Sequence, residues 1–196
     1  MPSQLARIAS LSLALALSAT AALPDDLCTG YTDTVQFDPA NGAACAALLP
    51  EVQSPSQADG SPKPLNVYEA KVGQFFNMYC HRDPMLGFAV DKDVRDTGPF
   101  VAYRDQDNAW VTEYHGTHAP VVIWYSPAML DWLKANRPAD AAAAPADAAP
   151  VPDGAIIVKE MFTPPASRCA GLDREKLIPQ NGIAYMVRDA GASRTM

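Results

Sequence analysis

The sequence is poor in the residues that most often build metal and haem sites. Its 196 residues include only three histidines and four cysteines. No two cysteines have the C-x-x-C spacing of a structural zinc site. The segment C-x-x-C-H, through which c-type haem is attached, is also absent. We therefore predict no metal site from the cysteines.

Positive charge and long apolar runs are scarce as well. Fifteen Lys and Arg residues stand against 22 Asp and Glu residues, which gives a formal net charge of −7. An acidic chain is repelled by phosphate backbones and by anionic lipid surfaces, so nucleic acid is not expected as a partner. The apolar run at residues 8–17 is short for a membrane helix, and no later run is longer. No membrane span is therefore expected.

The N-terminal residues follow the pattern of a secretory signal peptide. Arg7 supplies a positive charge, residues 8–17 form an apolar stretch, and Ala19-Thr20-Ala21 is typical of a cleavage site. We predict a signal peptide at residues 1–22 and a periplasmic or secreted mature protein.

Export makes disulfide bonds the expected state of the four cysteines, because an even number in an oxidising compartment favours pairing. Three pairings are possible. We favour Cys28–Cys45, since both residues lie in a loop-rich segment at 23–64 that has little else to hold it. Cys80–Cys169 would then form the second bond.

The spacing of apolar residues predicts an α+β domain over residues 65–196, with an antiparallel sheet and the helices packed on one side. A Ser126-Pro127 pair is typical of a helix start, with Ser as the N-cap. Pro50 is expected to end a short helix at 43–49, and residues 138–150 form an Ala/Pro-rich linker. The remaining elements are a helix at 66–80 and strands at 100–104, 110–115, 119–125, 155–162 and 182–189.

The strand at 155–162 follows a Pro-Asp-Gly turn and carries one charge on each of its two faces. Lys159 stands on one face and Glu160 on the other, among apolar residues. Such a charge needs a partner, a path to water or a chemical role. The favoured interpretation is that Lys159 extends to the sheet edge and that Glu160 faces solvent.

Two histidines, His115 and His118, flank a glycine at the junction of the second and third predicted strands, 110–115 and 119–125. A pair of histidines three residues apart is compatible with metal binding, but Gly116 indicates a turn and no third ligand lies near in sequence. Histidines that line a pocket are the favoured interpretation.

From residue 118 to residue 162 the chain resembles the cytochrome P-460 family of exported c-type haem proteins. The matching features are the apolar strand APVVIWYS, the Ser-Pro helix PAMLDWLKANR with Trp132, and then PDGAIIVKE. In that family a strand of this last form carries a lysine that cross-links to the haem. The resemblance places Lys159 at that position. We predict that Lys159 points to the concave, helix-poor side of the sheet and lines a pocket with His115 or His118, so that Lys159, His115 and His118 are the candidate cofactor-binding residues.

The family oxidises hydroxylamine, so the resemblance implies redox or electron-transfer chemistry on small nitrogen compounds, with a redox partner protein. Haem is expected from the resemblance, although covalent c-type attachment is not supported by this sequence. The alternative is a non-enzymatic exported domain that binds a small molecule or has a structural role, without haem. No catalytic residue is assigned, and neither reading requires a resident metal besides haem iron.

The end of the chain bears on whether a haem can be attached. The predicted strand at 182–189 is followed by only seven residues. The family's haem-attachment motif would require a further segment. We therefore expect that the domain is truncated at its C-terminus relative to that family.

Overall fold

A computed structural model describes residues 35–90, 94, 98–116, 119–136, 149–163, 166 and 177–189. The signal peptide expected at 1–22 and nearly all of the linker expected at 138–150 lie outside this part of the chain. The described elements are η1 (Pro39–Asn41), α2 (Gly42–Gln53), α3 (Leu65–Asn77), η2 (Cys80–Arg82), η3 (Pro84–Leu86), β1 (Ala89–Val90), β2 (Phe100–Arg104), β3 (Trp110–Tyr114), β4 (Val121–Tyr125), α4 (Pro127–Asn136), β5 (Ile156–Met161) and β6 (Ile183–Val187).

Four strands form the central sheet in the order β1-β4-β5-β6, and each pairs with its neighbour in the antiparallel sense. β5 lies in the interior of the sheet, where Lys159 pairs with Ile123 of β4 and with Ala184 of β6. The Gly154 turn before β5 has a φ of +74°, a conformation that glycine adopts readily. The predicted α+β class with an antiparallel sheet is confirmed.

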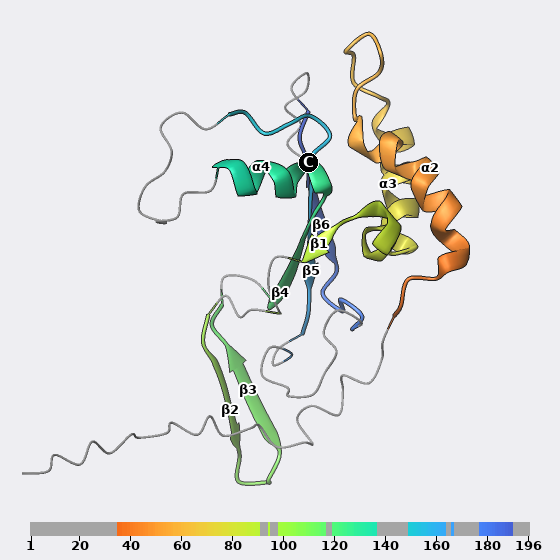
Figure 1. Ribbon diagram of the computed structural model, residues 1–196. Coiled ribbons are helices and arrows are strands. Elements are labelled where there is room, and N and C mark those ends of the chain that lie inside the picture. Colours follow the sequence, from red (N-terminus) through yellow and green to blue (C-terminus); the bar gives the residue numbers. More distant parts are fainter. Residues whose placement is uncertain are drawn as a thin grey trace, which may run out of the picture.

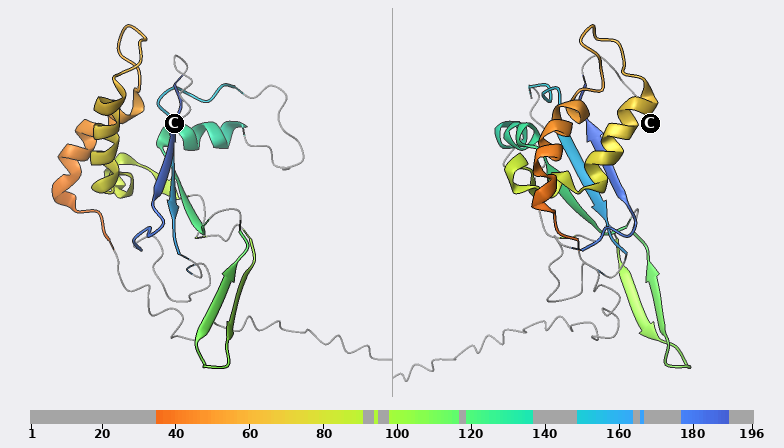
Figure 2. Two further views of the ribbon diagram at one scale, coloured as in Figure 1. Left: turned by 180° about the vertical axis from the view of Figure 1, so that it is seen from behind. Right: turned by 90° about the vertical axis from the view of Figure 1, so that its right-hand side faces the viewer.

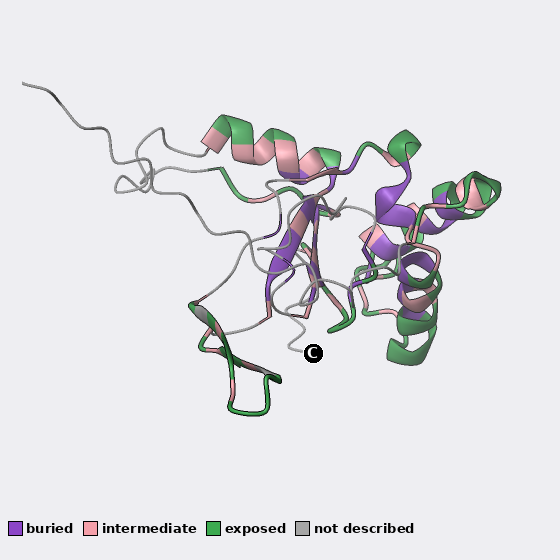
Figure 3. Cartoon of the chain, turned by 90° about the horizontal axis from the view of Figure 1, so that it is seen from below, coloured by how far each residue is buried: buried purple, intermediate pink, exposed green. Residues whose placement is uncertain are grey.

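Helices α2 and α3 lie together against one face of this sheet, and α4 extends from the end of β4 on the opposite side (Figure 1 and Figure 2). The core lies between the sheet and the α2–α3 pair, where Figure 3 shows most of the buried residues. It includes residues from both helices and from β4 and β5, among them Val52, Phe75, Trp124, Ile156 and Val158. Burial of this apolar surface is the main stabilising contribution to the domain.

β2 and β3 form a separate two-stranded sheet that projects away from the main body (Figure 2). The hairpin and its polar turn were predicted from the sequence, and both are confirmed. In the turn, the Asp105 carboxylate accepts hydrogen bonds from the backbone N–H groups of Asp107 and Ala109. Val101 and Tyr103 are 46% and 47% exposed, so this hairpin contributes little to the core.

The prediction that Pro50 ends the helix α2 at residue 49 is wrong. The helix runs to Gln53 and contains Pro50. A proline inside a helix removes one hydrogen bond, but tertiary contacts hold the last turn of α2. Val52 is fully buried, and its carbonyl oxygen accepts a hydrogen bond of 2.9 Å from the Tyr68 hydroxyl of α3.

Ser126 precedes α4 as predicted, and its backbone carbonyl accepts from the N–H of Leu130. Its buried hydroxyl oxygen accepts a hydrogen bond of 2.9 Å from the backbone N–H of Ile156. Ser126 therefore ties the start of α4 to the first residue of β5.

The disulfide bond in the described part of the chain joins Cys45 to Cys80, with a Cα–Cα distance of 5.3 Å. The predicted pairs Cys28–Cys45 and Cys80–Cys169 are therefore wrong. That prediction relied on segments being loop-rich, whereas the pairing depends on which elements meet in space. Cys45 lies in α2 and Cys80 in η2, and the bond links these two elements. Cys28 and Cys169 lie outside the described residues.

Among the helices that the structure describes, none has the length and apolar character needed to cross a lipid bilayer.

Candidate functional site

Lys159, the residue that the resemblance to cytochrome P-460 singles out, is half-buried on β5. It lies on the strand face that carries Ile157 and Met161, opposite the face covered by α2 and α3. This face of the sheet has less helical cover than the face against α2 and α3 (Figure 2).

His115 lies just after β3, at the base of the projecting hairpin. Its side chain is 60% exposed, and its Nε2 is 3.3 Å from a carboxylate oxygen of Glu113. His118 lies outside the described residues. The contacts of the described residues thus connect His115 to the hairpin and do not connect it to Lys159, and a shared site for the three residues stays a prediction.

Glu160, the other charge on β5, is completely buried, so the interpretation that it faces solvent is wrong. Its Oε1 accepts from Nε2 of His81 at 2.8 Å and from Nε of Arg82 at 2.8 Å. Its Oε2 accepts from Nε1 of Trp124 at 3.0 Å. We call these four residues the Glu160 cluster.

Arg82 connects the Glu160 cluster to three other parts of the chain. One terminal nitrogen donates to the Val35 carbonyl at 3.0 Å and the other to the Leu177 carbonyl at 2.8 Å. The guanidinium also lies over the Tyr79 ring, 4.9 Å from its centre. A planar group with five N–H donors is suited to hold several acceptors at once.

Protonation within the cluster follows from burial and charge. Burial lowers the pKa of His81 below its usual value, although the hydrogen bond to Glu160 opposes this effect. Burial alone raises the pKa of Glu160, but the hydrogen bonds from His81 and Arg82 and the charge of Arg82 outweigh it and lower the pKa overall. The cluster therefore holds a carboxylate, a guanidinium and a neutral imidazole near neutral pH.

Neutral His81 must carry its proton on Nε2, because that nitrogen donates to Glu160. Nδ1 then has a free lone pair. It is buried and is the one buried side-chain nitrogen or oxygen in the described residues without a hydrogen-bond partner. Most buried polar atoms are satisfied, so this nitrogen is unusual.

The local backbone explains how His81 and Arg82 come to point inward. Tyr79 follows α3 with a φ of +53°, a left-handed conformation that is uncommon for residues other than glycine. This reversal turns η2 back toward the sheet, where Cys80, His81 and Arg82 are all buried. The Cys45–Cys80 bond fixes the start of η2 to α2.

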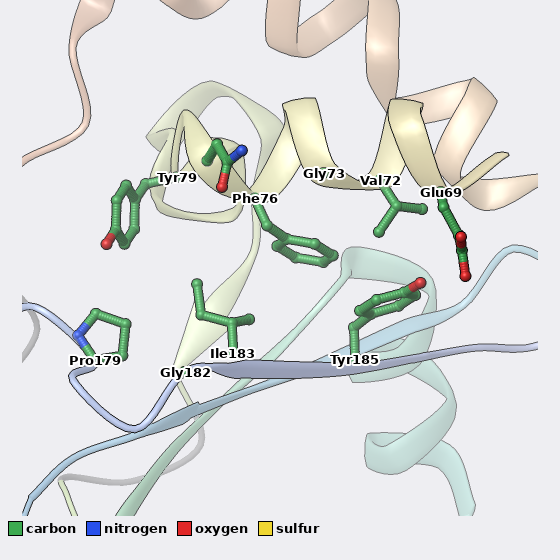
Figure 4. A pocket seen from close by; sticks show the side chains of 10 residues that line it. Glu69, Val72, Gly73, Phe76, Tyr79, Pro179, Gly182, Ile183 and Tyr185 are labelled. Atoms are coloured by element: carbon green, nitrogen blue, oxygen red, sulfur yellow. The ribbon is translucent and has the colours of Figure 1, made fainter. Parts of the chain in front are cut away.

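A pocket of 460 Å³ lies between α3 and β6 (Figure 4). Its lining residues Phe76 and Tyr79 also pack near His81 of the Glu160 cluster. Phe76 and Tyr185 meet across it, with ring centres 5.0 Å apart. Burial, and then the nearby Glu69 carboxylate, raise the pKa of Tyr185. One acidic residue and no Lys, Arg or His belong to the described lining, which consists of Glu69, Val72, Gly73, Phe76, Asn77, Tyr79, Pro179, Gly182, Ile183 and Tyr185.

No family model, curated protein or solved structure matches the chain. The resemblance to cytochrome P-460 thus stays a prediction from three sequence features in series.

The described residues do not fit a haem held by thioether bonds. Such a haem needs two free cysteine sulfurs, whereas both described cysteines are bonded to each other. Lys159 is also absent from the lining of the pocket between α3 and β6, because it lies on the opposite face of the sheet. We therefore derive no chemistry through a haem at this pocket.

The Glu160 cluster was only partly visible in the sequence. A charge at position 160 on an apolar strand face signalled a need for a partner, but the partners are 78 and 79 residues away. In the sequence, the adjacent pair His81-Arg82 begins an irregular, charge-rich stretch at residues 81–99, which is typical of a solvated loop. The available signal was the pair of adjacent residues His81 and Arg82, which can both donate to a carboxylate, next to Cys80.

Proposed function

We propose that the protein is an exported, non-enzymatic domain that binds a small organic cation in the pocket between α3 and β6. The observation that carries this proposal is the composition of the pocket wall. Its lining combines the aromatic residues Phe76, Tyr79 and Tyr185 with the carboxylate of Glu69 and includes no basic residue among those described.

Aromatic rings attract cations through the negative charge on their faces, and the attraction increases when water is excluded. Tyr79 and Tyr185 have raised pKa values, first because of burial. Both rings therefore stay uncharged over the physiological pH range. Glu69 is exposed at the edge of the pocket, where its charge can attract and orient an ammonium group.

The size and support of the pocket are suitable for a small ligand. Its 460 Å³ falls within the usual range for ligand pockets, about 300–1,000 Å³. The Tyr79 wall is held by the Arg82 guanidinium, which is itself fixed by Glu160.

Binding of benzylammonium, measured by titration calorimetry, tests this proposal. Benzylammonium has an aromatic ring and a cationic group, benzyl alcohol has the ring without the charge, and benzoate has the opposite charge. We expect affinity to decrease in that order. The Glu69→Gln variant should weaken benzylammonium binding several-fold, whereas Glu113→Gln, a matched change on the distant hairpin, should not.

Gly73 offers a second variant that blocks the pocket. A Cβ added at Gly73 meets no atom within 4 Å, so a larger side chain has room and extends from the lining. Gly73→Leu should leave the thermal unfolding temperature intact or raise it, because leucine favours a helix more than glycine does. It should abolish benzylammonium binding. Unchanged binding in this variant would contradict the pocket assignment.

Haem is the second candidate. The position of Lys159 favours it, since this lysine is half-buried on the sheet face that α2 and α3 leave uncovered. The resemblance implies a redox role on small nitrogen compounds in that case. Export of the protein from cells that produce c-type haem maturation machinery, followed by an absorption spectrum, is the test. A colourless product would rule this candidate out.

A further inference from the structure

The imidazole ring of His81, which carries the unsatisfied nitrogen, packs against two residues of the pocket wall. The imidazole centre is 5.6 Å from the Phe76 ring centre and 6.1 Å from the Tyr79 ring centre. Both aromatic residues also line the pocket, and Figure 4 shows them on its α3 side. The Trp124 ring packs against the imidazole at 5.6 Å in an edge-to-face arrangement.

The hydrogen bonds of the cluster determine what this nitrogen can bind. Nε2 is committed to Glu160, and the Glu160 carboxylate in turn orients the ring. This leaves Nδ1 as an acceptor that needs an N–H or O–H donor. A neutral acceptor backed by a carboxylate favours a cationic donor and disfavours an anion.

The segment that separates His81 from the pocket is also unusual in its backbone. Tyr79 is held in the left-handed region at a φ of +53°, which a bulky residue rarely adopts without cause. Strained backbone of this kind concentrates at binding sites and switch regions. A change of the Tyr79 side-chain rotamer would connect the pocket to the imidazole.

We propose that Nδ1 of His81 forms the inner end of the binding site and accepts a hydrogen bond from the ammonium group of the bound ligand. This inference rests on the proposed function of the pocket and specifies its ligand class further. The ligand is an amine with at least one N–H, its apolar part packs against the contacting rings of Phe76 and Tyr185, and its nitrogen reaches His81. A quaternary ammonium, which has no N–H, would lack this interaction.

The first experiment uses the free protein. We expect ¹⁵N spectra of the histidine side chains at neutral pH to show His81 with a proton on Nε2 and an unprotonated Nδ1. Addition of benzylammonium should shift the Nδ1 resonance in the direction of an accepted hydrogen bond. A proton on Nδ1 in the free protein, or a donor already engaged there such as an internal water that benzylammonium does not displace, would overturn the inference.

The second experiment separates the two proposals. In His81→Gln the side-chain amide still donates to Glu160 but has no acceptor at the position of Nδ1. We expect an affinity for benzylammonium about tenfold lower, and no change for benzyltrimethylammonium, with the melting temperature recorded to confirm folding. If both cations bind wild-type protein and lose nothing in His81→Gln, the His81 inference fails and the pocket stands. If neither cation binds wild-type protein, the proposed function itself fails, and the inference with it.

Discussion

At position 160 a carboxylate is buried on an otherwise apolar strand face, and three donors explain why this is tolerated. An isolated buried charge is very unfavourable, but Glu160 is paired with the Arg82 guanidinium and has both oxygens hydrogen-bonded. The same contacts make the pair sensitive to substitution. Removal of one member leaves the other charge buried without compensation.

We expect Glu160→Gln to lower the free energy of unfolding by about 3 kcal/mol or more, because Arg82 then keeps a buried, unpaired charge. Chemical denaturation at pH 7 measures the change. Glu113→Gln is the control, since Glu113 is an exposed carboxylate whose pairing with His115 has little effect on stability. Equal midpoints for Glu160→Gln and wild type would show that the cluster does not stabilise the fold.

The Glu160 cluster also predicts how stability depends on pH. The folded-state pKa of His81 lies below the usual value of 6.5, and that of Glu160 below 4.5. In both cases the unfolded chain binds the proton at a higher pH than the folded chain does. The free energy of unfolding therefore decreases as the pH falls. The loss begins near pH 6.5 through His81 and continues below pH 4.5 through Glu160.

Denaturation curves recorded from pH 8 to pH 4 test this dependence. In His81→Gln the part of the decrease that begins near pH 6.5 should be smaller, while the part below pH 4.5 should remain. A stability that rises between pH 6.5 and pH 5 would contradict the assignment of a buried neutral His81.

On the level of elements, the Cys45–Cys80 bond joins α2 to η2, which carries His81 and Arg82. It bridges residues 35 positions apart in the sequence. Such a bond stabilises the fold mainly because it restricts the unfolded chain. It also keeps η2 in the position from which its side chains reach Glu160.

We expect the double variant Cys45→Ala/Cys80→Ala to lose about 3–4 kcal/mol of stability, the value for a loop of this length. Denaturation under non-reducing conditions measures it. Because the bond also positions η2, the Nδ1 and Nε2 resonances of His81 should change in the same variant. A loss below about 1 kcal/mol with unchanged His81 resonances would show that packing alone holds η2.

The molecule as a whole has two cysteines beyond this bond, Cys28 and Cys169. The predicted export and the even number of cysteines predict that they are paired as well. By elimination, their partners are each other. We expect no reactive thiol in the mature protein under denaturing, non-reducing conditions, and a Cys28–Cys169 cross-linked peptide after proteolysis. Two reactive thiols per chain would contradict this pairing.

Much of the secondary structure was determined locally. The helix at α3, the strands at β2, β3 and β6 and the start of α4 follow from apolar spacing and turn residues that act over a few positions. α2 extends beyond its predicted end because Val52 and Tyr68 hold a turn that Pro50 weakens locally. A contact between helices is not visible in a short sequence window.

The sequence by itself determined the fold class, the acidic character of the chain and the presence of a charged residue, Glu160, on an otherwise apolar strand face. These follow from the alternation of apolar and polar residues, the composition and the turn residues, which are local properties. Only the tertiary structure decided which residues meet that charge and which cysteine pairs with Cys45. It also decided that the pocket lies on the opposite face of the sheet from Lys159. Each of these depends on long-range packing, in which residues far apart in the chain are brought together by the burial of one shared core.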